Sequence, residues 1–107
     1  MRFVSFRKDG NDKLGVRTDA GLVDLSIADK KIPTDLKELI TQGKGALQRA
    51  GRAAKNASSR AIVKGRVSYL TPVQNAGKIF CIGLNYKDHA AEGGFKNPTY
   101  PVVFTRF

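Results

Sequence analysis

One histidine lies close to a carboxylate in a short segment of this chain, and such a pair could move a proton. The segment KIFCIGLNYKDHAAEGG covers residues 78–94 and holds the only histidine and the only cysteine of the 107 residues. His89 and Glu92 are three residues apart, so on a helix their side chains share a face and can meet. Histidine titrates near neutral pH, and a neighbouring carboxylate fixes its tautomer and stabilises the imidazolium. The same spacing is also common on solvent-exposed helices, so the spacing alone leaves both interpretations open.

A strand and a helix are predicted to position this pair. Residues 78–82 form an apolar run without clean alternation, which is typical of a strand covered on both faces. Asn85 is a plausible N-cap for a helix over 85–92, and the glycine pair at 93–94 is typical of a helix C-cap. Tyr86 lies three residues before His89, on the same predicted helix face. The pair would therefore follow the carboxyl end of a strand.

Residues 82–92, IGLNYKDHAAE, resemble the G-x-N-Y-x-x-H-x-x-E motif of the fumarylacetoacetate hydrolase family. Residues 101–106, PVVFTR, are similar to the strand that follows this motif in the family, which usually ends in Lys-Pro. Residues 1–72 resemble the small N-terminal domain that many members carry. The resemblance covers the whole chain, and its most specific part is the motif at 82–92.

The resemblance implies metal-dependent chemistry on 1,3-dicarbonyl or 2-oxo acid substrates. The first expectation is C–C bond hydrolysis, such as acylpyruvate or fumarylacetoacetate cleavage. The alternatives within the family are an isomerase or a decarboxylase, of the 2-hydroxyhepta-diene-dioate or oxaloacetate type. By resemblance, His89 is the general base that activates water and Glu92 is its orienting partner. The residues expected to bind substrate are Asn85, Tyr86 and Arg106, although the last stands where the family usually has lysine and could instead form a surface salt bridge.

The resemblance also implies Mg²⁺ or Mn²⁺, acting as a Lewis acid on the oxo acid group. The family's metal ligands are three carboxylates, two of them in a Glu-x-Glu motif further along its chain, and no Glu-x-Glu occurs here. Hard cations need several oxygen ligands, which Asp88 and Glu92 alone could not supply. No metal ligand is therefore predicted in this chain, and the ligands are expected beyond residue 107. The chain is then part of a longer protein, the favoured option, or a truncated product without catalysis of its own.

Two further features near the motif have alternative interpretations. Cys81 could be a nucleophile with His89 as its base, but a cysteine within an apolar strand is more typical of a buried, inert thiol. Residues 93–98, GGFKNP, could form a lid that closes over a ligand, or an ordinary surface loop.

The formal net charge of +10 is concentrated in the middle of the chain, where residues 40–87 include Lys and Arg but neither Asp nor Glu. Such a field attracts nucleic acid or anionic substrates. Binding of single strands also needs aromatic side chains for stacking, and none occurs between Ile40 and Tyr69. A solvated basic surface is therefore favoured, and a non-enzymatic nucleic-acid-binding module that uses residues 44–66 is the alternative.

The first part of the chain predicts a small α+β domain. Strands are expected at 2–6, 14–18 and 22–25, joined by turns at 8–11 and 19–21, which gives an antiparallel meander. Helices are expected at 36–40, with Thr34 as N-cap and Leu36, Leu39 and Ile40 buried, and at 46–56, with Gly43 and Gly45 between them. The inner face of the second helix would be Leu47, Ala50 and Ala54, with Arg49, Arg52 and Lys55 outside. A further strand is expected over 61–70.

Pro72 suggests a domain boundary, because proline cannot join a central strand ladder. The predicted domains are residues 1–72 and residues 73–107, the second being the start of a β-rich catalytic domain. Its partners would be the oxo acid substrate, the remainder of that domain and, as is common in the family, a second copy in a homodimer. A single cysteine, no signal peptide and no apolar run of about 20 residues predict a cytoplasmic protein without membrane contact.

Overall fold

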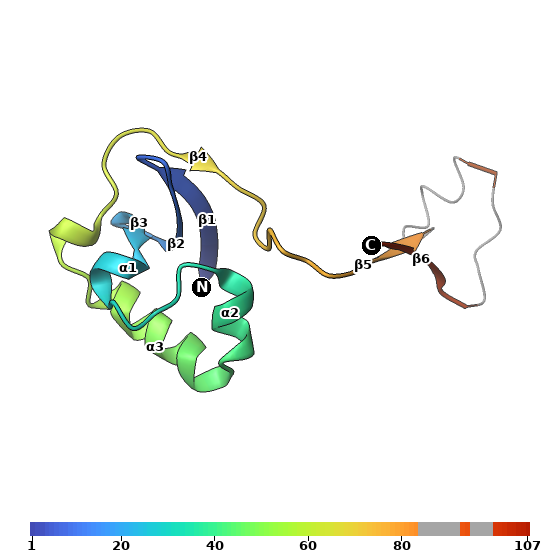
Figure 1. The fold of residues 1–107 in the computed structure, drawn as a ribbon, viewed down its shortest axis with the longest axis horizontal. Coiled ribbons are helices and arrows are strands. Elements are labelled where there is room, and N and C mark those ends of the chain that lie inside the picture. Colours follow the sequence, from blue (N-terminus) through green and yellow to red (C-terminus); the bar gives the residue numbers. More distant parts are fainter. Residues whose placement is uncertain (84–92, 95–99) are drawn as a thin grey trace. The chain divides into compact units, whose positions relative to one another are not determined.

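The computed structural model describes residues 1–83, 93–94 and 100–107 (Figure 1). These residues form two compact units, Met1–Asn75 and Ala76–Phe107, each with its own sheet. The combination of antiparallel sheet and short helices confirms the predicted α+β class. The domain boundary at residue 72 stays a prediction. Within the described ranges, no helix has the length and apolar character of a bilayer span.

The first unit is built on a four-stranded antiparallel sheet of order β3-β2-β1-β4 (Figure 1). The predicted meander is confirmed. Its first turn places Asp9 and Gly10 at φ of 50° and 77°, which matches the primed turns that suit two-residue hairpins. The strands are β1 (Arg2–Lys8), β2 (Asn11–Thr18), β3 (Gly21–Asp24) and β4 (Ser68–Tyr69).

Three α-helices and one 3₁₀ turn pack with this sheet around a single core. The elements are α1 (Leu25–Ala28), α2 (Leu36–Thr41), α3 (Lys44–Lys55) and η1 (Ser59–Ala61). Alternate residues of β2 point to the core, and α3 meets them with its alanine face, as predicted. The core cluster consists of Leu14, Val16, Leu25, Ile32, Leu39, Ala50 and Ala54.

The structure corrects three details of the predicted helices. The N-cap of α2 is Asp35 and not Thr34, because the Asp35 carboxylate accepts a hydrogen bond from the Glu38 backbone N–H at 2.9 Å. Ile40 is not buried but 52% exposed, since α2 packs through one narrow stripe centred on Leu39. Gly45 lies inside α3, which begins at Lys44 after an N-cap glycine.

The predicted strand over 61–70 is wrong for most of its length. Ile62 bridges Val23 and the Val63 N–H donates to Leu22, so this end lies along β3. Residues 68–69 instead pair with β1, at the opposite edge of the sheet from β3. One straight strand cannot reach two opposite edges of a sheet. The chain therefore crosses between them as an irregular segment.

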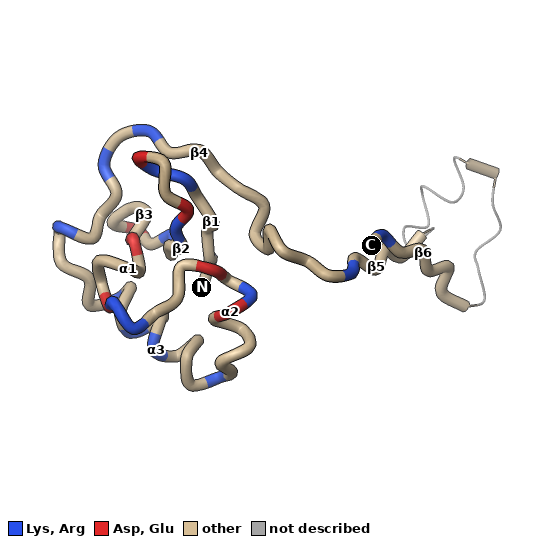
Figure 2. The backbone as a smooth tube through the Cα atoms, in the orientation of Figure 1, with Lys and Arg blue, Asp and Glu red and all other residues tan. Residues whose placement is uncertain are grey.

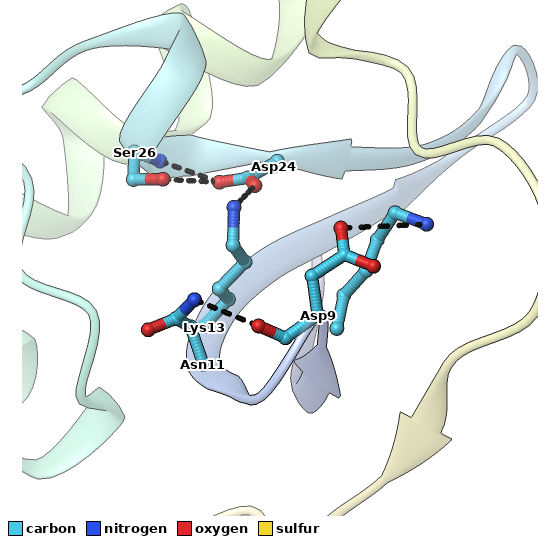
Figure 3. Close-up of polar contacts among 6 residues, drawn as sticks. Asp9, Asn11, Lys13, Asp24 and Ser26 are labelled. Carbon is cyan, nitrogen blue, oxygen red and sulfur yellow. Dashed lines mark hydrogen bonds and ion pairs between the residues drawn. The ribbon is translucent and has the colours of Figure 1, made fainter.

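Asp24 is the most buried charged side chain among the described residues and joins the sheet to α1 (Figure 3). Its carboxylate caps α1 by accepting hydrogen bonds from the Ser26 backbone N–H at 2.9 Å and the Ser26 hydroxyl at 2.6 Å. Lys13 of β2 donates to the other carboxylate oxygen at 2.6 Å. Every polar atom of this carboxylate therefore has a partner, and both its capping role and its ion pair depend on the charge.

Replacing Asp24 with alanine should destabilise the first unit by about 2–4 kcal/mol, because the helix cap is lost and Lys13 is left without its partner. Asp24→Asn keeps a capping oxygen and should lose less. Urea unfolding at neutral pH measures both. Asp12→Ala is the matched control, since it removes an exposed ion pair with Arg7, and surface pairs contribute little. An Asp24→Ala loss no larger than the Asp12→Ala loss would show that the buried pair is not structural.

The second unit contains a two-stranded antiparallel sheet of β5 (Ile79–Gly83) and β6 (Val102–Arg106). These strands confirm the apolar strands predicted at 78–82 and 101–106. The register runs from Ile79 opposite Arg106 to Gly83 opposite Val102.

Candidate functional site

Most of the predicted site lies outside the residues that the structure describes. This applies to His89, Glu92, Asn85 and Tyr86, and with them to the predicted helix over 85–92. It also applies to Asp88 and to most of the predicted lid, of which only the glycine pair at 93–94 is described. The roles assigned to these residues stay predictions. The described part of the site is the strand pair from which the motif departs.

The motif begins at the end of β5. Gly83, its first glycine, is the last residue of the strand and lies opposite Val102, the first residue of β6. A Cβ at Gly83 would meet Phe104 and Val102 atoms at 3.6 Å, an ordinary contact distance. Packing within the hairpin therefore does not itself require glycine here. The hairpin fixes where the motif starts and where the chain returns after it.

Arg106, the predicted substrate-binding cation, lies at the other end of the hairpin. It is opposite Ile79, four residues along the strand from Val102, which corresponds to about 14 Å in an antiparallel strand. Its side chain is exposed, and no carboxylate pairs with it within the described ranges. The structure therefore does not bring Arg106 to Gly83, and its contact with substrate stays a prediction.

Cys81 lies in the middle of β5 as a free, half-buried thiol opposite Phe104. It shares a face of the hairpin with Ile79 and Arg106, because alternate residues of a strand point to the same side. The thiol lies within an apolar strand as predicted but is half-buried and not buried, so the inert-thiol interpretation stays a prediction. His89, the predicted base for this thiol, lies outside the described residues, so the pairing of the two stays a prediction.

Both faces of the β5–β6 hairpin are apolar and exposed within the described residues. Side chains of large hydrophobic residues on the two strands are 42–67% exposed. Soluble proteins rarely leave a continuous apolar patch of this kind uncovered. This pattern is typical of strands that other elements cover on both sides. By register, Ile79, Val102 and Phe104 lie on one face, and Phe80, Ile82 and Val103 on the other.

The described residues do not offer a metal site. Among them, no group of three or more His, Cys, Asp or Glu side chains could hold a metal ion. These described residues therefore do not fit Mg²⁺ or Mn²⁺, and the ligand set implied by the sequence resemblance would have to lie outside them.

The basic residues between 44 and 66 are spread over α3, η1 and the following segment (Figure 2). One of them is already neutralised, because Arg49 donates from its Nε to Asp29 at 2.8 Å. As predicted, Arg49, Arg52 and Lys55 are exposed on α3. The nucleic-acid alternative stays a prediction.

Comparisons with known proteins give similarity over the whole chain. No family model matches. Oxaloacetate tautomerase fahd2, mitochondrial, of Xenopus laevis is 32% identical over 111 residues, which are 100% of this chain and 34% of that protein. Fumarylacetoacetate hydrolase domain-containing protein 2 homolog of Dictyostelium discoideum is 33% identical over 96 residues, covering 89% of this chain and 31% of that protein.

A third relative carries the name of a different enzyme, and a solved structure is similar in fold. The 2,4-didehydro-3-deoxy-L-rhamnonate hydrolase of Sphingomonas sp. (strain SKA58) is 35% identical over 107 residues, covering 99% of this chain and 33% of that protein. The crystal structure of an HpcE protein from Mycobacterium smegmatis superimposes with a TM-score of 0.73 at 28% identity, covering 100% of this chain and 36% of that chain. The chain thus spans about a third of the length of the relatives that it matches.

Proposed function

This chain belongs to the fumarylacetoacetate hydrolase family, and from that premise we propose that it is the N-terminal part of an enzyme for 2-oxo acid or 1,3-dicarbonyl substrates. The observation that carries the proposal is the motif at 82–92, which starts at the last residues of β5 in a chain similar over its whole length to enzymes. His89 is the group that moves a proton, and Glu92 orients it.

The relatives support two reaction types. Three vertebrate relatives are named oxaloacetate tautomerases, and the Sphingomonas relative is named a hydrolase. Hydrolysis of a C–C bond needs a base that removes a proton from water. Tautomerisation needs a base that moves a proton between carbon and oxygen of the same substrate. Both reactions therefore use one imidazole near neutral pH, and hydrolysis and tautomerisation fit this chain equally well.

The other predicted residues have binding roles in this proposal. Asn85 and Tyr86 offer an amide and a phenol that can donate hydrogen bonds to a substrate oxygen. Arg106 keeps the positive charge of the family's usual lysine and, if the complete site brings it close, pairs with a substrate carboxylate. A divalent metal, bound by carboxylates beyond residue 107, would supply Lewis acid chemistry to the complete enzyme.

The apolar hairpin supports the proposal that further sheet of the catalytic domain covers β5 and β6. Both faces carry exposed large hydrophobic side chains, and a strand pair with free edges readily accepts neighbouring strands. The remainder of that domain is the proposed partner. A homodimer also stays a proposal. The cytoplasmic location stays a proposal too, and it differs from the location in the names of the vertebrate relatives, which are mitochondrial.

Turnover by the complete protein tests this proposal. Ketonisation of enol oxaloacetate is followed by its ultraviolet absorbance, and acylpyruvate cleavage by release of pyruvate, each with added Mg²⁺ or Mn²⁺ and after chelation. We expect metal-dependent turnover in one of the two assays, and the active assay identifies the reaction type. Absence of turnover in both, with metal present and the protein folded, would contradict the proposal.

A further inference from the structure

A groove in the first unit has the composition of an anion site. The segment after α1, together with α2 and α3, lines a groove of about 800 Å³ that is open to solvent. Cavities that bind small molecules commonly measure about 300–1,000 Å³. The lining residues Arg49 and Arg52 of α3 and its C-cap residue Asn56 are spaced by three and four positions, so they follow one side of the helix to its end. We call this open site the α2–α3 groove.

The groove combines an apolar floor with a cationic rim. Ile32 and Leu39 lie at its base as parts of the core, only 4% and 1% exposed. Its accessible apolar surface comes from the partly exposed residues Ala28, Pro33, Ala46 and Ala53. Three cations surround this floor: Lys31, Arg49 and Arg52, all exposed. The groove could therefore contact the carbon skeleton of a ligand below and its charged groups at the rim.

One carboxylate lies among the described residues that line the groove, and it organises the rim without neutralising it. Asp29 accepts hydrogen bonds from the Arg49 Nε at 2.8 Å and from the Lys31 backbone N–H at 3.0 Å. The Lys31 N–H, followed by Arg49, holds the pKa of the Asp29 carboxyl below its usual value. Asp29 is therefore ionised at neutral pH and balances one of the three cations. The charges that remain give the groove a net charge of about +2.

A second role of Arg52 has to be separated from ligand binding. Arg52 and Lys55 both lie in the last turn of α3, where positive charge is favourable to the helix dipole. This effect explains why the helix ends with two cations. It does not explain why Arg52 lines the same groove as Lys31 and the apolar residues. Lys55 does not line the α2–α3 groove, which makes it a matched control for Arg52.

We propose that the α2–α3 groove binds a small anion that carries at least two oxyanion groups, carboxylates or phosphates. Guanidinium groups match the geometry of both groups with paired hydrogen bonds. Asp29 holds Arg49 in place, while Arg52 and Lys31 have no carboxylate partner within the described ranges. The site lies in the first unit and is independent of the reaction proposed for the motif at 82–92.

The test is an NMR titration of the 107-residue chain with citrate and, separately, with pyrophosphate, at an ionic strength kept constant with sodium chloride. We expect saturable shifts of the Arg49 and Arg52 side-chain Nε–H signals and of the Lys31 amide. Loss of one charge-assisted contact should weaken binding at least about tenfold in Arg52→Gln. Lys55→Gln removes the same charge from the same helix turn and should change affinity less than about twofold.

The probes separate the two ligand chemistries. Binding of citrate alone identifies a carboxylate site, binding of pyrophosphate alone identifies a phosphate site, and binding of both supports a general oxyanion site. Shifts that do not saturate, or equal weakening by Arg52→Gln and Lys55→Gln, would overturn the proposal, because they indicate diffuse attraction to a basic helix. The thermal unfolding midpoints of both variants, measured alongside, confirm that each is folded.

Discussion

His89→Ala should reduce turnover of the complete protein by about 10²- to 10⁴-fold, the usual contribution of a positioned general base. Removal of the imidazole leaves no other group in residues 82–92 that titrates near neutral pH. The loss should appear in kcat, since proton transfer contributes to the transition state rather than to substrate binding. Steady-state kinetics at saturating substrate measure it directly.

Two further variants make this result specific to the motif. Lys87→Ala changes a variable position of the motif, to which the proposed reaction assigns no role, and should leave kcat within about threefold. Glu92→Gln removes the charge that stabilises the imidazolium and should lower kcat less than His89→Ala does. A His89→Ala loss of less than tenfold would contradict the assignment of His89 as the base.

Gly15→Ala should destabilise the first unit by about 3 kcal/mol, at the upper end of typical overpacking costs. An added Cβ would lie 2.6 Å from the Val23 carbonyl oxygen, 2.9 Å from Leu22 Cδ1 and 3.0 Å from Phe6 Cε1. The nearest of these atoms belongs to the backbone of β3, which the sheet pairing holds in place. Strand β2 therefore has to shift against both of its neighbours. Urea unfolding followed by circular dichroism measures the free energy of unfolding.

Gly45→Ala is the matched control for this prediction. A Cβ at Gly45 would meet nothing within 4 Å, and the residue lies in the first turn of α3. Alanine is a better helix former than glycine, so this variant should be more stable by about 0.5–1 kcal/mol. If Gly15→Ala were as stable as the unmodified chain, the close packing of β2 between β1 and β3 would be wrong.

The first unit could be predicted from the sequence wherever local signals decide the structure. The turns at 8–11 and 19–21 between short strands predicted the meander, and the alanine stripe of α3 predicted its buried face. The short helix α1 was missed, because Leu22–Leu25 read as a strand and the capping role of Asp24 is visible only in the fold. The prediction of a strand at 61–70 was wrong for a non-local reason, since the two ends of this segment pair with opposite edges of one sheet.

The two candidate sites also differ in how far local sequence could predict them. The motif at 82–92 is contiguous, so sequence similarity could identify it without a fold. The α2–α3 groove joins Lys31 to Arg49 and Arg52 only because α3 packs beside the segment after α1. In the sequence these residues were separate surface charges. An isolated signal existed in Asp29, a carboxylate beside two lysines, but its pairing with Arg49, twenty residues away, had no local indication.

The intact mass of the native protein that carries this sequence, determined by denaturing mass spectrometry, tests the central claim most directly. Metal-dependent catalysis requires carboxylates that the described residues do not supply, and the relatives are about three times as long as this chain. We predict a mass well above the 11.7 kDa of these 107 residues, or a second chain that accompanies them. A single species of 11.7 kDa would contradict the account, because His89 would then lack the remainder of the catalytic domain.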